Sequence, residues 1–260
     1  CKHKSALGSS YTQKGRSGFR GKGSCLLHRK GEKQMQPLEL YIHIPFCVKK
    51  CAYCDFLSGP AGEKEKEEYV KMLVDEIRNC PDTVQNYRVI SIFFGGGTPS
   101  LLTGEQIGRL MDTVREIFTL DEDAEITMEM NPGTVTEEKL RKYRQAGVNR
   151  LSIGLQSVND EELRLLGRIH TYEEFREAYH LARANGFSNI NVDLISAIPG
   201  QTVESWRRTL EQVMALSPEH ISAYSLILEE GTTFYKKYVE DEAKEGPKLP
   251  DEDAERQMYW

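Results

Sequence analysis

Six short runs of apolar and β-branched residues alternate with longer segments of helical periodicity, and this alternation limits the possible folds more than any other feature of the chain. The predicted strands cover residues 41–44, 89–94, 125–130, 150–154, 190–196 and 221–227. Helical patterns lie near residues 63–79, 103–118, 136–146, 160–166, 171–185 and 202–216. Unbroken alternation predicts an α/β domain with a parallel sheet, either doubly wound or closed toward a barrel.

Local signals support several of the predicted helix ends. Thr103 with Gln106, and Thr171 with Glu174, have the spacing of a capping box, in which two side chains satisfy backbone N–H groups at a helix start. Gly147 follows the last periodic residue of another helix, where a left-handed C-terminal cap is expected.

Charge is distributed unevenly along the chain. The net charge is −6, but residues 1–34 carry nine Lys or Arg and one acid, which gives +8, and the remaining 25 basic and 39 acidic residues give −14. A basic segment rich in Gly and Ser is typical of disorder, of a transit peptide or of a nucleic-acid contact. Met35 directly precedes "QPLELYIHIPFC", where a natural start would fall. We therefore expect residues 1–36 to be a disordered arm outside the domain, and we expect no nucleic-acid partner.

The remainder of the chain is predicted to form a core domain over residues 37–231. Residues 232–260 end in a charged helical pattern, and we interpret them as the start of a truncated C-terminal region. No apolar run approaches the roughly 18 residues that span a bilayer, so we do not expect an integral membrane protein. The cysteines are concentrated rather than dispersed, which favours a reducing compartment and hence a cytoplasmic protein.

Polar and glycine-rich motifs recur where the predicted strands end. Cysteines follow the first strand, "GGGT" (95–98) follows the second, and Glu129 ends the third. "GLQS" (154–157) closes the fourth strand, and Asp193 interrupts the apolar fifth. In parallel α/β sheets, ligands bind at the carboxyl ends of the strands, so all these motifs are predicted to lie on one functional rim.

Three cysteines, Cys47, Cys51 and Cys54, form a C-x3-C-x2-C run. A structural zinc site takes four protein ligands, and His43 is the candidate for a fourth. A cubane iron–sulfur cluster normally takes four thiolates, so three would leave one iron with a position open to a small molecule. The run therefore favours a 4Fe-4S cluster that binds a ligand, with zinc as the alternative.

Six motifs agree in order and spacing with those of a known family: "YIHIPFCVKKCAYCDF", "FFGGGTPSLL", "EMNPGT", "NRLSIGLQS", "VDLISAIPGQT" and "SAYSLILEEGT". They resemble the radical S-adenosylmethionine (radical SAM) superfamily, and within it the oxygen-independent coproporphyrinogen III dehydrogenases and their HemW-type heme chaperone relatives. The resemblance covers residues 38–260. It implies a partial (β/α)6 barrel of the TIM-like type, with the three cysteines as cluster ligands and S-adenosylmethionine chelated at the open iron.

The resemblance also implies contacts to S-adenosylmethionine. Tyr41 resembles a tyrosine that contacts this cofactor. Gly96, Gly97 and Thr98 resemble the glycine-rich loop that receives its methionine end, and the absence of side chains allows a close backbone approach. Glu129 resembles the acid that binds the ribose or the amino group.

Further contacts to the adenosyl moiety, or to a second cofactor, are implied for Gln156, Arg168 and Asp193. For Arg168 the alternative is a solvated cation at a helix end. Asp193 lies between Val192 and Leu194, and an acid in a buried parallel strand needs a hydrogen-bonding partner.

Phe56 separates two functional interpretations. The dehydrogenases of this family place a further cysteine two residues after the third ligand, whereas "CDF" is typical of the HemW-type relatives. We therefore expect a heme chaperone that binds heme or a porphyrin and delivers heme to membrane hemoproteins, and the alternative is an oxygen-independent coproporphyrinogen III dehydrogenase. No heme ligand is assigned, since the following histidines are interpreted as surface or capping residues: His28, His43, His170, His180 and His220.

Overall fold

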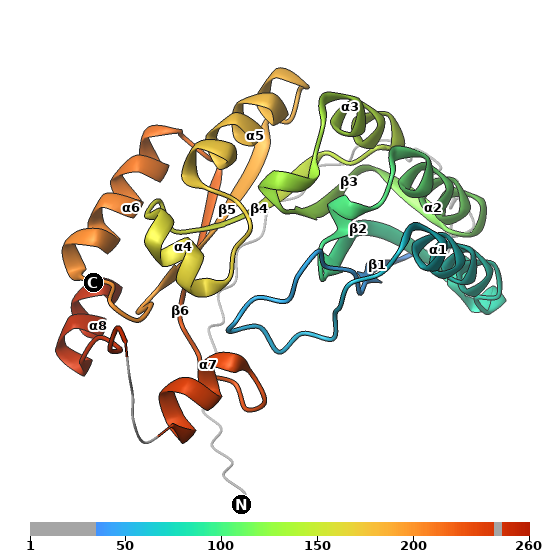
Figure 1. Cartoon of the computed structure of the whole chain (residues 1–260). Helices are drawn as coiled ribbons and strands as arrows, with labels where there is room; N and C mark the ends of the chain where they lie inside the picture. Colours follow the sequence, from blue (N-terminus) through green and yellow to red (C-terminus); the bar gives the residue numbers. More distant parts are fainter. Residues whose placement is uncertain (1–34, 242–245) are drawn as a thin grey trace, which may run out of the picture. The chain divides into compact units, whose positions relative to one another are not determined.

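The computed structural model of the chain describes residues 35–241 and 246–260. Most of the predicted basic arm lies outside the described residues. Six parallel strands form one sheet in the order β1-β2-β3-β4-β5-β6, with β1 and β6 at its edges (Figure 1). The strands are β1 Gln36–Ile44, β2 Tyr87–Gly96, β3 Thr119–Met130, β4 Arg150–Gln156, β5 Asn189–Ser196 and β6 His220–Ser225. The sheet curls into a half-barrel, which confirms the predicted partial (β/α)6 fold.

Helices follow the strands as predicted, with two of them, α4 and α5, between β4 and β5. They are α1 Glu63–Arg78, α2 Gly104–Ile117, α3 Glu137–Ala146, α4 Asp160–Leu166, α5 Tyr172–Ala184 and α6 Val203–Ala215. Short 3-10 turns cover Asp82–Asn86, Pro99–Leu101 and Pro132–Thr134. The predicted caps form: the Thr103 hydroxyl accepts from the Gln106 N–H at 3.2 Å, the Gln106 Oε1 accepts from the Thr103 N–H at 2.8 Å, and Gly147 has a φ of 106°.

The two faces of the sheet differ in polarity. Alternate residues point to opposite faces of a strand, and those that face the helices are apolar and buried. Ile126 and Met128 of β3, for example, join the large core cluster. The intervening residues of the same strand, Thr127 and Glu129, lie on the other face. Parallel sheets usually bury apolar side chains on both faces, so a polar inner face indicates that the half-barrel lines a binding site.

Segments beyond β6 pack against the core. They comprise α7 Thr233–Tyr235, a π-helical turn Lys236–Glu240 and α8 Glu252–Tyr259. The indole N–H of Trp206 donates to the carbonyl of Met258 at 2.8 Å, and this bond fixes α8 against α6. The N–H of Phe234 donates to the carbonyl of Ala52 at 2.9 Å, and this bond joins α7 to the loop that follows β1.

No helix in the described part of the chain is long and apolar enough to cross a membrane.

Candidate functional site

The cysteine loop runs from β1 to α1, over residues 45–62, and several backbone hydrogen bonds fix it. The N–H of Cys47 donates to the carbonyl of Gly59 at 2.9 Å, and the N–H of Gly59 donates to that of Pro45 at 3.0 Å. On the far side of the loop, the N–H of Ala52 donates to the carbonyl of Leu166 at the end of α4, at 2.9 Å. The first two bonds close the loop on itself, and the third attaches its middle to the end of α4.

The three cysteines of this loop are free, half-buried thiols. The Thr98 hydroxyl donates to the Cys47 sulfur at 3.7 Å, and a guanidinium N–H of Arg168 donates to the Cys51 sulfur at 3.7 Å. Burial raises the pKa of the Cys54 thiol, and the neighbouring Cys51 and Cys47 add to this rise, so the three sulfurs lie within electrostatic reach of one another. Grouped thiols with donors directed at their sulfurs fit a thiolate-bound iron–sulfur cluster.

Within residues 35–241 and 246–260, no three His, Cys, Asp or Glu side chains are grouped so as to hold a single metal ion.

The "GGGT" motif lies directly against the cysteine loop. A Cβ atom on Gly97 would stand 2.6 Å from the carbonyl oxygen of Phe46, and the Gly97 N–H donates to the Ile44 carbonyl at 2.9 Å. Gly96 has a φ of 117°, a conformation that side-chain-bearing residues rarely adopt. Position 97 therefore requires glycine for close packing, and position 96 requires it for backbone conformation.

Glu129 ends β3 beside this motif and faces the interior of the half-barrel. Its Oε2 accepts the Gly96 N–H at 2.9 Å. Burial raises the pKa of Glu129 to about 7, the Gly96 hydrogen bond opposes this rise, and Asp193 adds to it. Tyr41 also lies within reach of this charge: burial raises its pKa, and Glu129 raises it further. Glu129 therefore lies within electrostatic reach of both the exposed Tyr41 and Asp193.

Asp193 has the partners that its buried strand position requires. Ser152 of β4 donates to its Oδ2 at 2.9 Å, and the Asn191 amide donates to its Oδ1 at 2.7 Å. Burial raises the pKa of Asp193, and these hydrogen bonds lower it.

Arg168 is held inside the rim, not at a solvated helix end. One of its terminal nitrogens donates to the Asn131 Oδ1 at 2.7 Å and to the Gly154 carbonyl at 2.6 Å. A Cβ on Gly154 would stand 3.1 Å from this nitrogen and 3.0 Å from the Gln156 amide nitrogen, so both side chains converge over Gly154. Gln156 is itself buried, with a left-handed φ of 78°. Such strain in a non-glycine residue is more common at functional sites.

Sequence reasoning did not identify several of these neighbours. Asn131, Ser152 and Tyr53 lie within the motifs quoted above, but the sequence did not single them out as contacts of Arg168, Asp193 and the cysteines. Tyr53 lies between Cys51 and Cys54, and burial raises its pKa while Arg168 lowers it. The interpretation of His170 as a surface or capping residue is wrong: it is 3% exposed, and burial, with repulsion from Arg168, lowers its pKa to about 3.

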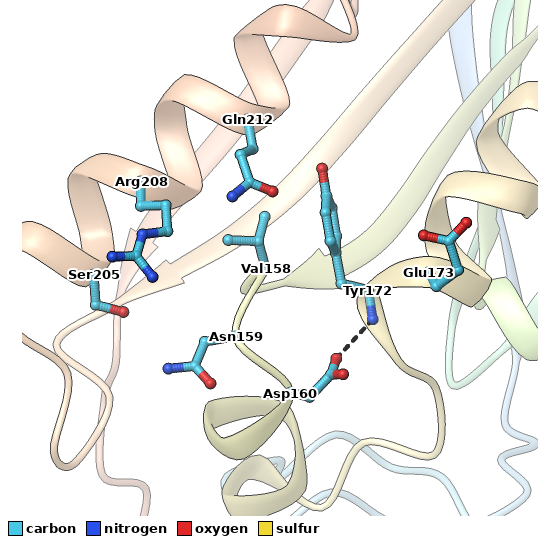
Figure 2. A pocket seen from close by; sticks show the side chains of 8 residues that line it. All are labelled: Val158, Asn159, Asp160, Tyr172, Glu173, Ser205, Arg208 and Gln212. Carbon is cyan, nitrogen blue, oxygen red and sulfur yellow. Dashed lines mark hydrogen bonds between the residues drawn. The ribbon is translucent and has the colours of Figure 1, made fainter.

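A hollow of about 470 Å³ lies elsewhere, between α6 and the first turns of α4 and α5. Figure 2 shows its lining residues: Val158, Asn159, Asp160, Tyr172, Glu173, Ser205, Arg208 and Gln212. Several of them stabilise helix ends, as Asp160 does by accepting the Tyr172 N–H at 2.8 Å (Figure 2). None of the predicted site residues lines this hollow.

Fold and site together define a class of protein: a partial parallel barrel with a three-cysteine loop after its first strand. The chain belongs to the radical SAM superfamily, whose family model matches residues 41–213. Membership in this superfamily implies a 4Fe-4S cluster and S-adenosylmethionine.

Curated relatives include the heme chaperone HemW of Escherichia coli, which is 45% identical over 222 residues, 85% of this chain and 57% of its own. The radical S-adenosyl methionine domain-containing protein 1, mitochondrial, of Danio rerio is 37% identical over 198 residues, 76% of this chain and 45% of its own. The chain thus spans about half the length of the curated relatives it matches.

Among solved structures, coproporphyrinogen III oxidase (HemN) from Escherichia coli, a radical SAM enzyme, aligns with a TM-score of 0.77 and 33% identity. The alignment covers 87% of this chain and 51% of that one. Methylornithine synthase (PylB), at 14% identity and a TM-score of 0.54, shares the fold alone.

Proposed function

We propose that Cys47, Cys51 and Cys54 hold a 4Fe-4S cluster and that S-adenosylmethionine binds beside it on the inner rim. The grouped thiols and the donors that Thr98 and Arg168 direct at two of the sulfurs support the cluster. When bound, the cluster supplies an iron that can coordinate the methionine end of the cofactor and an electron that can cleave it.

The chain's own residues provide binding and orientation at this rim. Gly96 and Gly97 keep the backbone bare where the methionine end would approach, and Thr98 fixes Cys47. Glu129 offers a carboxylate for the amino or ribose group. Tyr41, which is exposed and stacks on Phe93 at a centroid distance of 6.1 Å, gives this side of the site an aromatic wall.

Gln156 of β4, Asp193 of β5 and Arg168, which follows α4, complete the proposed contacts. Gln156 and Arg168 converge over Gly154, while Asp193 is fixed by Ser152. An amide, a guanidinium and a carboxylate together offer both donors and acceptors, as an adenosyl group or a second cofactor requires.

For the whole protein we propose a heme chaperone that binds heme and delivers it to hemoproteins, membrane hemoproteins among them, in the cytoplasm. The observation that carries this proposal is the 45% identity to a heme chaperone over 85% of the chain. Phe56 supports it, because it occupies the position at which the resembling dehydrogenases carry a further cysteine, and its side chain is 63% exposed.

The second candidate is oxygen-independent coproporphyrinogen III oxidation. The 33% identity and TM-score of 0.77 to the coproporphyrinogen III oxidase HemN favour it. Both candidates use the same cluster and cofactor, so they differ in what the protein does to a tetrapyrrole.

Two assays on the anaerobically reconstituted protein separate these functions. A heme chaperone is expected to take up heme stoichiometrically, seen as a Soret band that follows the protein through gel filtration, and to pass it to an apo-hemoprotein. It is not expected to convert coproporphyrinogen III to protoporphyrinogen IX. Catalytic conversion without heme transfer would refute the chaperone proposal and establish the second candidate.

A further inference from the structure

Arg168 joins three segments that are distant in the sequence. One terminal nitrogen bonds the Asn131 side chain and the Gly154 carbonyl, and the other donates to the sulfur of Cys51, 117 residues away. The remaining donor, Nε, is buried and makes no hydrogen bond within the described chain. A partly buried guanidinium with two short anchors is fixed in position rather than mobile.

The backbone around Arg168 brings it to the cysteine loop. Gly167 precedes it with a φ of 78°, and a Cβ there would stand 3.3 Å from the Ala52 nitrogen. That same nitrogen donates to the Leu166 carbonyl. The end of α4 and the loop at Cys51 and Ala52 are therefore in direct backbone contact, and the Arg168–Cys51 pair forms part of this contact.

The charge of Arg168 has a physical consequence at the cluster. Three thiolates give an oxidised 4Fe-4S cluster a net negative charge, and one-electron reduction makes it more negative. A fixed cation that donates an N–H to a ligand sulfur stabilises the more negative state more strongly, because both the Coulomb energy and the hydrogen bond grow with charge on the sulfur.

We propose that Arg168 is a positioning residue that sets the reduction potential of the cluster through Cys51, and this rests on the proposal that the three cysteines hold that cluster. Arg168 favours the reduced state, from which an electron is available to a bound cofactor. This role is separate from a contact to S-adenosylmethionine, since it acts on the cluster before any cofactor binds.

The test is a mediated potentiometric titration with dithionite, followed by EPR, on reconstituted protein without S-adenosylmethionine. Arg168→Gln removes the cation from Cys51. Arg164→Gln is the matched control, because it removes an equal charge from an exposed side chain of α4, four residues before Arg168. Among the described residues Arg164 donates to the Asp160 carbonyl alone. Arg168→Lys keeps the positive charge but loses the several N–H donors of the guanidinium. Asn131→Ala keeps the guanidinium but removes its hydrogen bond to the Asn131 side chain.

At a fixed applied potential, Arg168→Gln is expected to lower the ratio of reduced to oxidised cluster roughly three- to tenfold. Only the difference in hydrogen-bond strength between the two oxidation states changes this ratio, and that difference is a part of the full strength of a hydrogen bond to a charged group. Arg164→Gln is expected to match the wild type, and Arg168→Lys and Asn131→Ala are expected to fall between. The proposal is overturned if Arg168→Gln titrates like Arg164→Gln. If Arg168→Gln cannot hold the cluster, the reduction potential of Asn131→Ala tests the proposal instead. A wild-type reduction potential in Asn131→Ala would then overturn the proposal. Wild-type protein that fails to hold iron would instead refute the cluster assignment itself.

Discussion

Gly97 packs so closely against the cysteine loop that a single added methyl group should displace the cluster ligands. A Cβ at this position would stand 2.6 Å from the carbonyl oxygen of Phe46 and 2.9 Å from its nitrogen and carbonyl carbon. These are backbone atoms of the residue before Cys47, so a side-chain rotation cannot relieve the overlap. Gly97 has no positive φ, so the effect of Gly97→Ala is one of space alone.

The cost of this overpacking is about 1–3 kcal/mol of unfolding free energy. Gly108→Ala is the control, because a Cβ on Gly108, within α2, meets nothing within 4 Å. That substitution is expected to stabilise the protein by about 0.5–1 kcal/mol, since alanine loses less backbone entropy in a helix.

The assay combines urea unfolding of the cluster-free protein with iron and sulfide analysis after anaerobic reconstitution. Gly97→Ala is expected to unfold at lower urea and to retain a minor fraction of the wild-type iron, whereas Gly108→Ala is expected to retain all of it. Wild-type stability and wild-type iron in Gly97→Ala would refute the reasoning from close packing.

The remaining predictions concern two buried carboxylates. Burial raises the pKa of Glu129 to about 7, so its carboxylate ionises between pH 6 and pH 8 and becomes able to accept hydrogen bonds. The affinity for S-adenosylmethionine, measured by calorimetry, should therefore rise roughly tenfold over this range. Glu129→Gln should abolish this pH dependence. Burial raises the folded pKa of Glu129 above its ordinary value of 4.5, so the folded state binds more protons than the unfolded state. The unfolding free energy should therefore fall as pH rises from 4.5 to about 7, and an equal slope in Glu129→Gln would contradict this. Glu162 is 5% exposed and accepts from Ser157 at 2.6 Å and from Gln201 at 2.9 Å. Glu162→Gln should therefore cost about 1–3 kcal/mol in urea unfolding, and Glu161→Gln, its exposed neighbour, much less; equal losses would argue against a role for the buried network.

The order of elements was predictable from local patterns. Every predicted strand and helix is present, and the capping boxes at Thr103 and Thr171 form as expected because they depend only on residues three apart. The beginning of β3 was missed by six residues. It starts at Thr119, where it pairs with Arg88, and a register irregularity before Glu125 makes this part look like a polar loop in the sequence.

The residues of the candidate site could be predicted from the sequence only where they belong to a recognisable motif. The cysteine run and the glycine-rich loop can be recognised in the sequence, because local backbone geometry fixes the spacing of their residues. The position of Arg168 against Cys51, and its anchor on Asn131, depend on how three loops meet at the rim. No local pattern encodes such a meeting, and the isolated sequence therefore left a solvated helix-end cation as an alternative.

The central claim is that three thiolates leave an iron open to S-adenosylmethionine. Its most direct test is the EPR spectrum of the reconstituted, reduced protein, recorded before and after the cofactor is added. We predict a 4Fe-4S signal that changes on addition of S-adenosylmethionine. A cluster signal that is indifferent to the cofactor in the wild type, or a reconstituted protein that holds zinc and no iron–sulfur absorption, would contradict the account.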